Sequence, residues 1–391
     1  MNVLYDTVCN KVLSCNANDH SHMFSDSNIT YAIGKLKRGK SDGYDGLSSD
    51  YIINGTPTLF NYISILFSLM LSHCCVPDSF CVSTMVPIPK GSGSTADMKN
   101  YRGIALSSLF SKLFDTCTIY SQCTSLSSND LQYAYKQKTS TVQCVSSVIE
   151  TVNYYINNSG NIYMCMLDAS KAFDRVNLLL LFKKLLKRNM CPLFLRFLMH
   201  SYCTQRMLIK WNHVLSDDFC ISNGVKQGGV LSPLLFNVYL DELLSDLQDQ
   251  GIGCHLHGVF VGAHVYADDV TLLAPTSTAL NAMLTTCTLF AESHDLTFNA
   301  SKTKCMYFTK SDINTHDCIN FMNNAIEFVN NTQLLGIYIS NDILDRNINC
   351  TVQHYYSKCN SMCYLFIQLG VNQSDVFGSC HPRPTVIYCQ L

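Results

Sequence analysis

Four residues, Tyr266-Ala-Asp-Asp269, separate two short apolar runs and most constrain what this chain can fold into. The runs are Val261-Gly-Ala-His-Val265 and Val270-Thr-Leu-Leu-Ala274, so the pattern predicts a β-hairpin with two adjacent carboxylates at its tip. Neighbouring like charges raise each other's pKa unless a cation neutralises them. The pair therefore indicates a divalent metal site, with an ordinary polar turn as the alternative.

A third carboxylate should lie elsewhere, and Asp168 is the best candidate because it follows the apolar run 161–167. Two-metal transfer of a nucleotidyl group requires carboxylates that bridge two hard cations. Helices between well-separated strands would let the strand ends converge on one face. We therefore expect Asp168 and Asp268 to meet, although they are 100 residues apart. The alternative is that Asp168 only caps a helix.

Bulk composition sets wider limits. The chain has 391 residues, of which 47% are apolar, and this combination predicts a folded protein with two or three packed subdomains. The formal net charge is −2, which argues mildly against a nucleic-acid binder. A local groove can nevertheless be basic while the total is neutral.

The 21 cysteines form no CxxC pair, and the first ten residues resemble no signal peptide. These features predict reduced, mostly buried thiols in an intracellular protein of the cytoplasm and nucleus. A zinc knuckle built from Cys359, Cys363, Cys380 and His381 is an alternative, although its spacing matches no common pattern. The most apolar stretch, 59–71, is too short for a membrane span and predicts a buried helix.

The order of elements is mixed. Residues 1–25 are polar and predicted to be irregular. Residues 82–89 are predicted to form an edge strand, because proline cannot donate to a ladder. Apolar spacing predicts helices at 104–118, 142–156 and 176–187.

At this point the motifs resemble a known family, the reverse transcriptases of non-long-terminal-repeat (LINE-like) retrotransposons. The blocks occur in the family's order across roughly residues 30–340, which makes the resemblance far more specific than the Tyr-Ala-Asp-Asp turn alone. They are Gly39-Lys-Ser-Asp-Gly-Tyr-Asp-Gly46, Tyr101-Arg-Gly-Ile-Ala-Leu106, Leu167-Asp-Ala-Ser-Lys-Ala-Phe-Asp174, Gly224-Val-Lys-Gln-Gly-Gly-Val-Leu-Ser-Pro233, Tyr266-Ala-Asp-Asp269, Asn299-Ala-Ser-Lys-Thr-Lys304 and Leu334-Leu-Gly-Ile337.

The resemblance implies an α+β right-hand polymerase with a palm sheet, helical fingers and a partial thumb. The implied division is an irregular segment at 1–25, fingers with part of the palm at 26–160, palm with an interleaved fingers segment at 161–340, and a partial thumb at 341–391. The chain is shorter than complete elements of this class, so we expect a polymerase core from a truncated copy.

The resemblance also implies roles for individual residues. Asp168, Asp268 and Asp269 would be the catalytic metal ligands. Phe173 would be an aromatic gate against the ribose 2′-hydroxyl, with an ordinary core phenylalanine as the alternative. Gln227 would belong to the glycine-rich turn that approaches template and nucleotide.

Further roles concern the phosphates and the primer. Lys90 and Arg102 would reach the incoming triphosphate, although Gly103 stands where the family usually has proline. Either Lys302 or Lys304 would protonate the leaving pyrophosphate. Leu335 and Gly336 would form the primer grip.

The implied function is RNA-directed DNA synthesis with two Mg²⁺ ions, or Mn²⁺ in their place. The implied partners are an RNA template, a DNA primer or target and deoxynucleoside triphosphates, with no membrane and no inferable stable protein partner. One alternative is an inactive remnant that keeps the fold without catalysis. Another is a neighbouring polymerase, either an RNA-dependent RNA polymerase or an intron-encoded reverse transcriptase.

Overall fold

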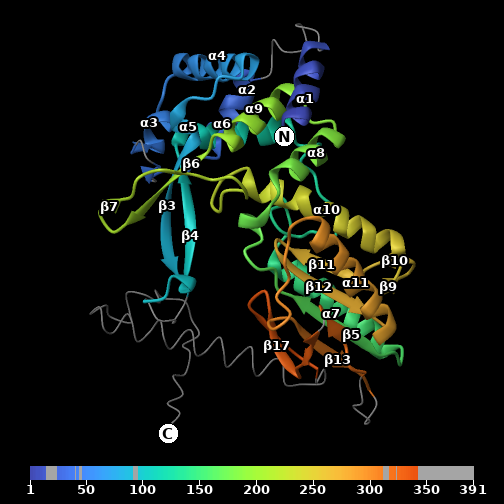
Figure 1. Ribbon diagram of the computed structural model, residues 1–391. Coiled ribbons are helices and arrows are strands. Elements are labelled where there is room, and N and C mark those ends of the chain that lie inside the picture. The colour runs from blue at the N-terminus through green and yellow to red at the C-terminus, as the bar shows by residue number, and fades with distance from the viewer. Residues whose placement is uncertain are drawn as a thin grey trace, which may run out of the picture.

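A computed structural model describes residues 1–14, 24–39, 41–43, 46–90, 96–310, 317–322 and 324–341. The described chain is α+β, as predicted. A mainly helical upper body carries one sheet, and a lower body is built around a second sheet (Figure 1). The zinc-knuckle candidates and thumb residues 342–391 lie outside the described residues.

The lower sheet has the strand order β11-β12-β5-β13-β16. Strand β5 is central, antiparallel to both β12 and β13, while β16 runs parallel to β13. The strands are β5 (Ile162–Leu167), β11 (Ala263–Tyr266), β12 (Asp269–Ala274), β13 (Lys304–Phe308) and β16 (Glu327–Phe328).

Side chains that alternate along β5 enter two different cores. Cys165 and Leu167 belong to a large cluster with helices α10 (Ser232–Gln250) and α11 (Ser277–Ser293). Met164 belongs to a second cluster with α7 (Thr141–Asn157) and the hairpin β17 (Asn331–Leu334) and β18 (Ile337–Ser340). Both faces of the sheet are therefore covered, which explains why β5 is apolar at nearly every position.

The upper sheet has the order β4-β3-β6-β7, and β8 also pairs with β6. Its strands are β3 (Val82–Pro89), β4 (Tyr101–Ser107), β6 (Arg206–Trp211), β7 (Val214–Leu215) and β8 (Phe219–Cys220). The helices of this body are α1 (Asn2–Ser14), α2 (Asp26–Gly34), α3 (Ser49–Ile53), α4 (Pro57–His73), α5 (Asp78–Cys81), α6 (Leu109–Ser121), α8 (Leu178–Lys187) and α9 (Pro192–Cys203).

Strand β3 matches the prediction in its bounds but not in its place, because it lies between β4 and β6 and is not an edge strand. The prolines are tolerated because β6 pairs only with residues 82–85. Pro87 and Pro89 thus extend beyond the end of β6, where no backbone partner requires their missing N–H.

Two further expectations were wrong. Residues 2–14 form α1 and are not irregular, because Leu4, Tyr5 and Val8 pack against the core. The predicted helix at 104–118 is split between β4 and α6. Ser108 begins the helix by accepting a hydrogen bond from the Ser111 N–H, so the chain changes structure there.

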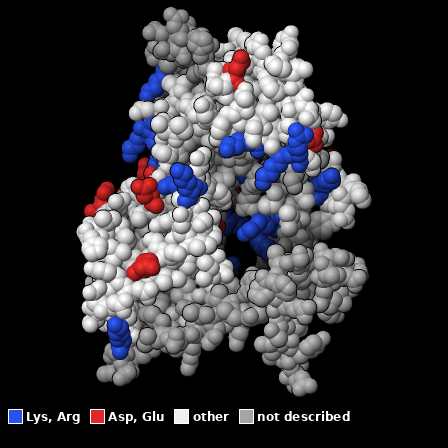
Figure 2. All heavy atoms as spheres, turned by 180° about the vertical axis from the view of Figure 1, so that it is seen from behind, with Lys and Arg blue, Asp and Glu red and all other residues white. Residues whose placement is uncertain are grey.

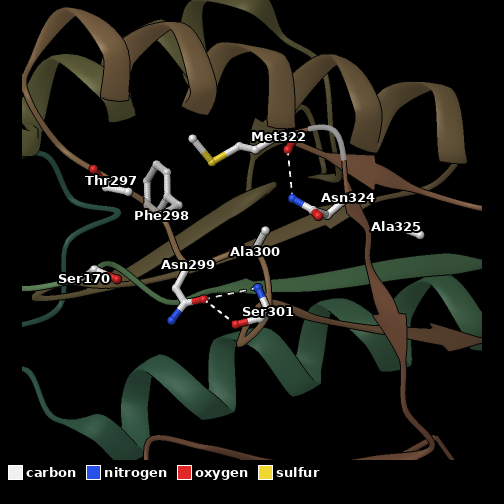
Figure 3. A pocket seen from close by; sticks show the side chains of 9 residues that line it. All are labelled: Ser170, Thr297, Phe298, Asn299, Ala300, Ser301, Met322, Asn324 and Ala325. Carbon is white, nitrogen blue, oxygen red and sulfur yellow. Dashed lines mark hydrogen bonds between the residues drawn. The ribbon is translucent and has the colours of Figure 1, made fainter. Parts of the chain in front are cut away.

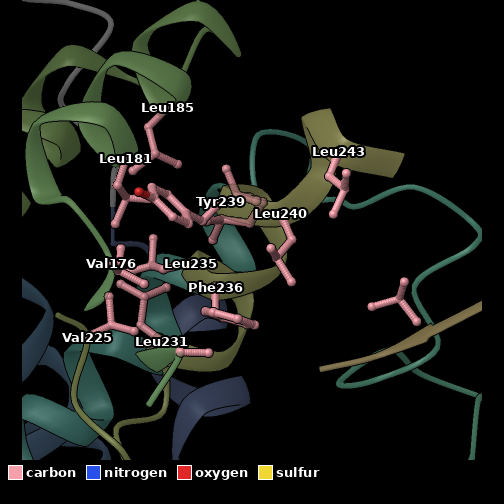
Figure 4. Close-up of a cluster of buried hydrophobic side chains, with 14 of the residues drawn as sticks. Val176, Leu181, Leu185, Val225, Leu231, Leu235, Phe236, Tyr239, Leu240 and Leu243 are labelled. Carbon is pink, nitrogen blue, oxygen red and sulfur yellow. The ribbon is translucent and has the colours of Figure 1, made fainter. Parts of the chain in front are cut away.

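Helices α8 and α10 join the two bodies through one apolar contact. Figure 4 shows Leu181 and Leu185 of α8 directed toward Tyr239 of α10. Beside them the buried Lys184 ammonium bonds the Glu242 carboxylate and lies over the Tyr239 ring. A charge at this position is retained because it is both paired and stacked.

Short elements complete the described chain, and no described helix is long and apolar enough to cross a membrane. They are the 3₁₀ turns η2 (Met98–Asn100) and η3 (Phe173–Arg175), and the hairpins β1 (Ser41–Asp42) with β2 (Leu47–Ser48), β9 (His255–Leu256) with β10 (Val259–Phe260), and β14 (Asn320–Phe321) with β15 (Asn324–Ala325).

His264 of β11 is a buried titratable group, with 1% of its surface exposed. Its Nε2 lies 2.8 Å from the Ser147 hydroxyl, and its ring stacks on Tyr133. Burial lowers the pKa of His264 to about 4. The folded state therefore disfavours the protonated ring that the unfolded chain accepts near pH 6.5.

We expect His264 to make the fold acid-sensitive. Its contribution to stability is complete above pH 6.5 and is lost as the pH falls toward 4, amounting to about 2 kcal/mol between pH 7 and 5. Urea unfolding of wild type and His264→Gln at both pH values measures it. Equal pH dependence in the two proteins would contradict the assignment.

Candidate active site

The register between β5 and β12 sets the geometry of the site. Leu167 is paired with Val270, so the residues that follow and precede them, Asp168 and Asp269, stand at the same end of adjacent strands. Tyr266 pairs with Asp269 across a tight turn whose second residue is Asp268. The structure therefore brings together the three carboxylates that the sequence singled out.

These carboxylates influence one another. Burial raises the pKa of Asp269 to about 6, with Asp268 and Asp168 adding to the rise and Arg102 opposing it. Burial also raises the pKa of Asp268, which its own backbone N–H and Arg102 lower and Asp168 raises. Although its surroundings desolvate the carboxyl group, Asp269 keeps part of its surface exposed, so water screens part of this repulsion.

Arg102 comes from the other body. It is exposed on β4, yet its charge acts on both Asp268 and Asp269. The next residue, Gly103, packs so closely on Met85 that an added Cβ would lie 2.7 Å from the sulfur. Gly103 stands where the resembled family usually has proline, and close packing on Met85 holds β4 at this position.

Asp168 is fixed from its other side by residues 297–302. Its carbonyl accepts from the Asn299 N–H at 2.7 Å, and the next turn places Lys302 Nζ 3.7 Å from Asp168 Oδ2. Residues 297–301 and Ser170 line an open pocket of about 590 Å³, to which Met322 and Asn324 also contribute (Figure 3). Lys304 instead begins β13, opposite Met166.

The glycine-rich turn lies between the two bodies. Gly224 N–H and Val225 N–H donate to the carbonyls of Val176 and Phe173, while the Gln227 carbonyl accepts from Ala105 of β4 at 2.6 Å. At Gly228, where φ is +101°, an added Cβ would lie 2.7 Å from the Ala105 oxygen. Only glycine allows this approach, so the turn connects η3 to β4 through its backbone.

Phe173 lies at the start of η3 and is partly buried. Its ring stacks on Phe236 of α10, with 4.5 Å between the ring centroids. The residue as a whole is partly exposed, so packing on Phe236 does not bury it completely. The gate and the core interpretation thus both stay open.

The remaining predicted residues lie farther from the carboxylates. The charge of Lys90 acts on Asp174, next to Phe173, and not on the turn aspartates. Leu335 and Gly336 form the two-residue turn between β17 and β18, both with positive φ. Leu335 packs on the second core, and no contact in the described chain assigns it to the aspartate cluster.

Two residues near the turn were missed by sequence reasoning. Tyr135, half exposed and at φ +60°, lies within electrostatic range of Asp268, Tyr266 and Arg102. Gln132, with 1% exposure, hydrogen-bonds the backbone of Ala267. A positive φ and a backbone partner leave no periodic pattern in a sequence, so neither residue gave a signal.

The donor set suits a divalent ion. Three carboxylates at one sheet edge supply the hard oxygen ligands that Mg²⁺ prefers, and their mutual repulsion is what a cation would relieve. Within the described ranges, no three Asp, Glu, His or Cys side chains are close enough together to hold a metal ion as they stand. The three aspartates therefore fit Mg²⁺ by the chemistry of their ligand atoms, not by a preformed coordination geometry.

Surface charge is distributed unevenly. Figure 2 shows a hollow in one face, with Lys and Arg side chains gathered beside it. A locally basic surface thus coexists with a net charge of −2, as the sequence allows.

Comparison with known proteins supports the same interpretation. The sequence matches the family described as "Reverse transcriptase (RNA-dependent DNA polymerase)" over residues 88–339. It is 31% identical over 140 residues to the Pol polyprotein of the type-2 retrotransposable element R2DM of Drosophila melanogaster, covering 36% of this chain and 13% of that protein.

Two further similarities are broader. The chain is 22% identical over 375 residues to the RNA-directed DNA polymerase from mobile element jockey of Drosophila funebris, covering 91% of this chain and 40% of that protein. A structure of apo telomerase from Candida tropicalis, truncated from its C-terminal domain, aligns with a TM-score of 0.45 at 15% identity, covering 74% of this chain and 60% of that one.

The chain thus spans well under half the length of these retrotransposon relatives. The family match nevertheless covers more than half of its 391 residues, including every carboxylate of the site. The chain therefore belongs to the reverse transcriptase family, as a domain of the non-LTR, LINE-like class.

Proposed function

We propose that this chain catalyses RNA-templated DNA synthesis, adding deoxynucleotides to a primer 3′-hydroxyl. The observation that carries the proposal is the pairing of Leu167 with Val270, which sets Asp168 beside Asp268 and Asp269. The hydroxyl oxygen forms a bond to the α-phosphorus and gives up its proton to water, while the bond from the α-phosphorus to the oxygen that bridges to the β-phosphate breaks and pyrophosphate leaves.

The three aspartates would hold two Mg²⁺ ions, or Mn²⁺ in their place. Bound there, the ions would lower the pKa of the primer hydroxyl and stabilise charge on the leaving pyrophosphate. Asp168, Asp268 and Asp269 suit this task because they share one sheet edge and repel one another without a cation.

Basic residues would bind the triphosphate and protonate the product. We assign Arg102 to the phosphates, since its charge acts on the turn aspartates. Lys90 would contribute from the neighbouring strand, near Asp174. Of the two candidate general acids we favour Lys302, because it lies 3.7 Å from Asp168 whereas Lys304 begins β13.

The uncharged residues would position the sugar, template and primer. Phe173 would exclude the ribose 2′-hydroxyl, since Phe236 holds its ring in place. Gln227 would approach the nucleotide from the turn that joins η3 to β4. Leu335 and Gly336 would support the primer from the β17–β18 hairpin.

This assignment makes residues 26–160 fingers with part of the palm. Residues 161–340 would form the palm together with one fingers segment. Strand β6 supports that division, because it pairs with β3 of the upper sheet although it follows β5 in the chain. The RNA template and DNA primer would lie between the bodies, where the charge of Arg102 acts on Asp268 and Asp269.

The decisive experiment is primer extension by the purified chain on an RNA template with a DNA primer, deoxynucleotides and Mg²⁺. Template-dependent extension supports the proposal. A folded protein that extends no primer with either Mg²⁺ or Mn²⁺ would instead be the inactive remnant.

We expect Asp268→Asn to separate activity from stability. Loss of one metal ligand should lower extension on the order of 10²- to 10³-fold. Thermal unfolding with a chelator present should shift upward, because removing one charge relieves the repulsion on Asp269. Asp249→Asn, on the exposed last turn of α10, makes the same charge change away from the turn as a control. Near-normal extension by Asp268→Asn would refute the ligand assignment.

We expect Phe173→Val to admit ribonucleotides. The ratio of kcat/KM for deoxy- over ribonucleoside triphosphates should fall about tenfold or more, since a steric clash is removed. Phe328→Val removes another partly buried ring from the lower body and serves as the matched control. Sugar discrimination that stays unchanged in Phe173→Val, or falls equally in the control, would leave Phe173 a core residue.

A further inference from the structure

The aspartate hairpin has a short backbone partner that the sheet order does not include. Residues 131–133 run beside β11, with the Tyr133 N–H donating to the Val265 carbonyl at 2.8 Å and the Val265 N–H donating to Leu131 at 2.9 Å. Gln132 pairs with Val265 in a parallel bridge. The outer edge of β11 is therefore hydrogen-bonded at Val265, two residues before Ala267.

Gln132 holds the turn itself. Its side-chain oxygen accepts from the Ala267 N–H at 3.0 Å, and its side-chain nitrogen donates to the Ala267 carbonyl at 3.3 Å. The same oxygen accepts from the Ala134 N–H at 2.9 Å, which fixes the amide in this orientation. One side chain, 1% exposed, thus satisfies both peptide groups of the residue before Asp268.

Ala267 needs such support because its φ is +58°. A side chain with a Cβ is disfavoured in this left-handed region, and the residue is held there only if its surroundings fix it. Relaxation of Ala267 to a negative φ would rotate the peptide that leads to Asp268 and change the direction of both turn carboxylates. The hydrogen bonds of Gln132 oppose that rotation.

A second buried amide anchors the segment. Asn237 of α10, also 1% exposed, donates from Nδ2 to the Ala134 carbonyl at 2.9 Å. Helix α10 begins directly after the glycine-rich turn, so the segment that carries Gln132 is tied to the element that follows Gln227.

We propose that Gln132 is a positioning residue of the polymerase site, which fixes the left-handed Ala267 and so aims Asp268 and Asp269. The expected effect on catalysis rests on the proposed function. The expected effect of Gln132 on the structure of the turn does not. Gln132 touches neither primer nor nucleotide in this role and acts only through the backbone of Ala267.

The test compares Gln132→Met, which keeps the size of the side chain and removes its hydrogen bonds, with Asn28→Leu. Asn28 is also buried and bonds Ser121 and Ser25, but it lies on α2 in the upper body. In primer extension we expect Gln132→Met to lower kcat about tenfold to a hundredfold with little change in the KM for deoxynucleotide. Asn28→Leu should show a similar loss of melting temperature with near-normal kcat.

Rescue distinguishes positioning from simple destabilisation. Glycine adopts a positive φ without strain, so Ala267→Gly added to Gln132→Met should restore part of the lost kcat. No recovery in the double variant, or a kcat loss in Gln132→Met no larger than in Asn28→Leu, would overturn the proposal.

Hydrogen exchange tests the hold on the turn without requiring activity. Peptides spanning residues 263–272 should exchange faster in Gln132→Met than in wild type, while those from α2 and α6 remain unchanged. Unchanged exchange at the turn in Gln132→Met would show that Gln132 does not hold Ala267, even if the enzyme is active. If wild type extends no primer but the turn still exchanges faster in Gln132→Met, the hold of Gln132 on the turn is supported and only the proposed function is rejected.

Discussion

The pairing of β5 with β12 is the constraint on which the site depends. Leu167 faces Val270, and a shift of one residue would turn every side chain of β5 to the opposite face. Cys165 would then leave the core of α10 and α11, and Met164 would leave the core of α7. The apolar contacts on both faces therefore fix the register, and the register in turn sets Asp168 beside the turn aspartates.

A second condition is that the two bodies meet at this edge. Arg102 acts on Asp268 and Asp269 from β4, and Gln227 bonds Ala105 of the same strand. Neither contact follows from the lower sheet alone. The packing of α8 on α10, together with the Lys184–Glu242 ion pair, holds the two bodies together beside these contacts. The candidate site is thus a property of the assembled chain.

The sequence predicted the parts of this arrangement that have local signatures. The aspartate hairpin could be predicted from two apolar runs around a charged tip, and β3 from its composition. The central position of β3 could not be predicted, because its partner β6 lies 124 residues further along the chain (Val82 pairs with Arg206) and pairs with only half of it. Arg102 and Lys302 were proposed only through family resemblance, since a lone basic residue has no pattern. Gln132 could not be predicted because its hydrogen-bond partners are peptide groups, which any residue carries. Helix α1 could not be predicted because its formation depends on packing against the core.

The close approach of Gly228 to Ala105 limits which residue can stand where the two bodies meet. The space beside the Gly228 Cα is already filled, because an added Cβ would lie 2.7 Å from the Ala105 oxygen and 3.1 Å from an Ile104 methyl carbon. Any larger residue at position 228 would therefore push β4 away from the glycine-rich turn and strain the backbone, which has a φ of +101° there.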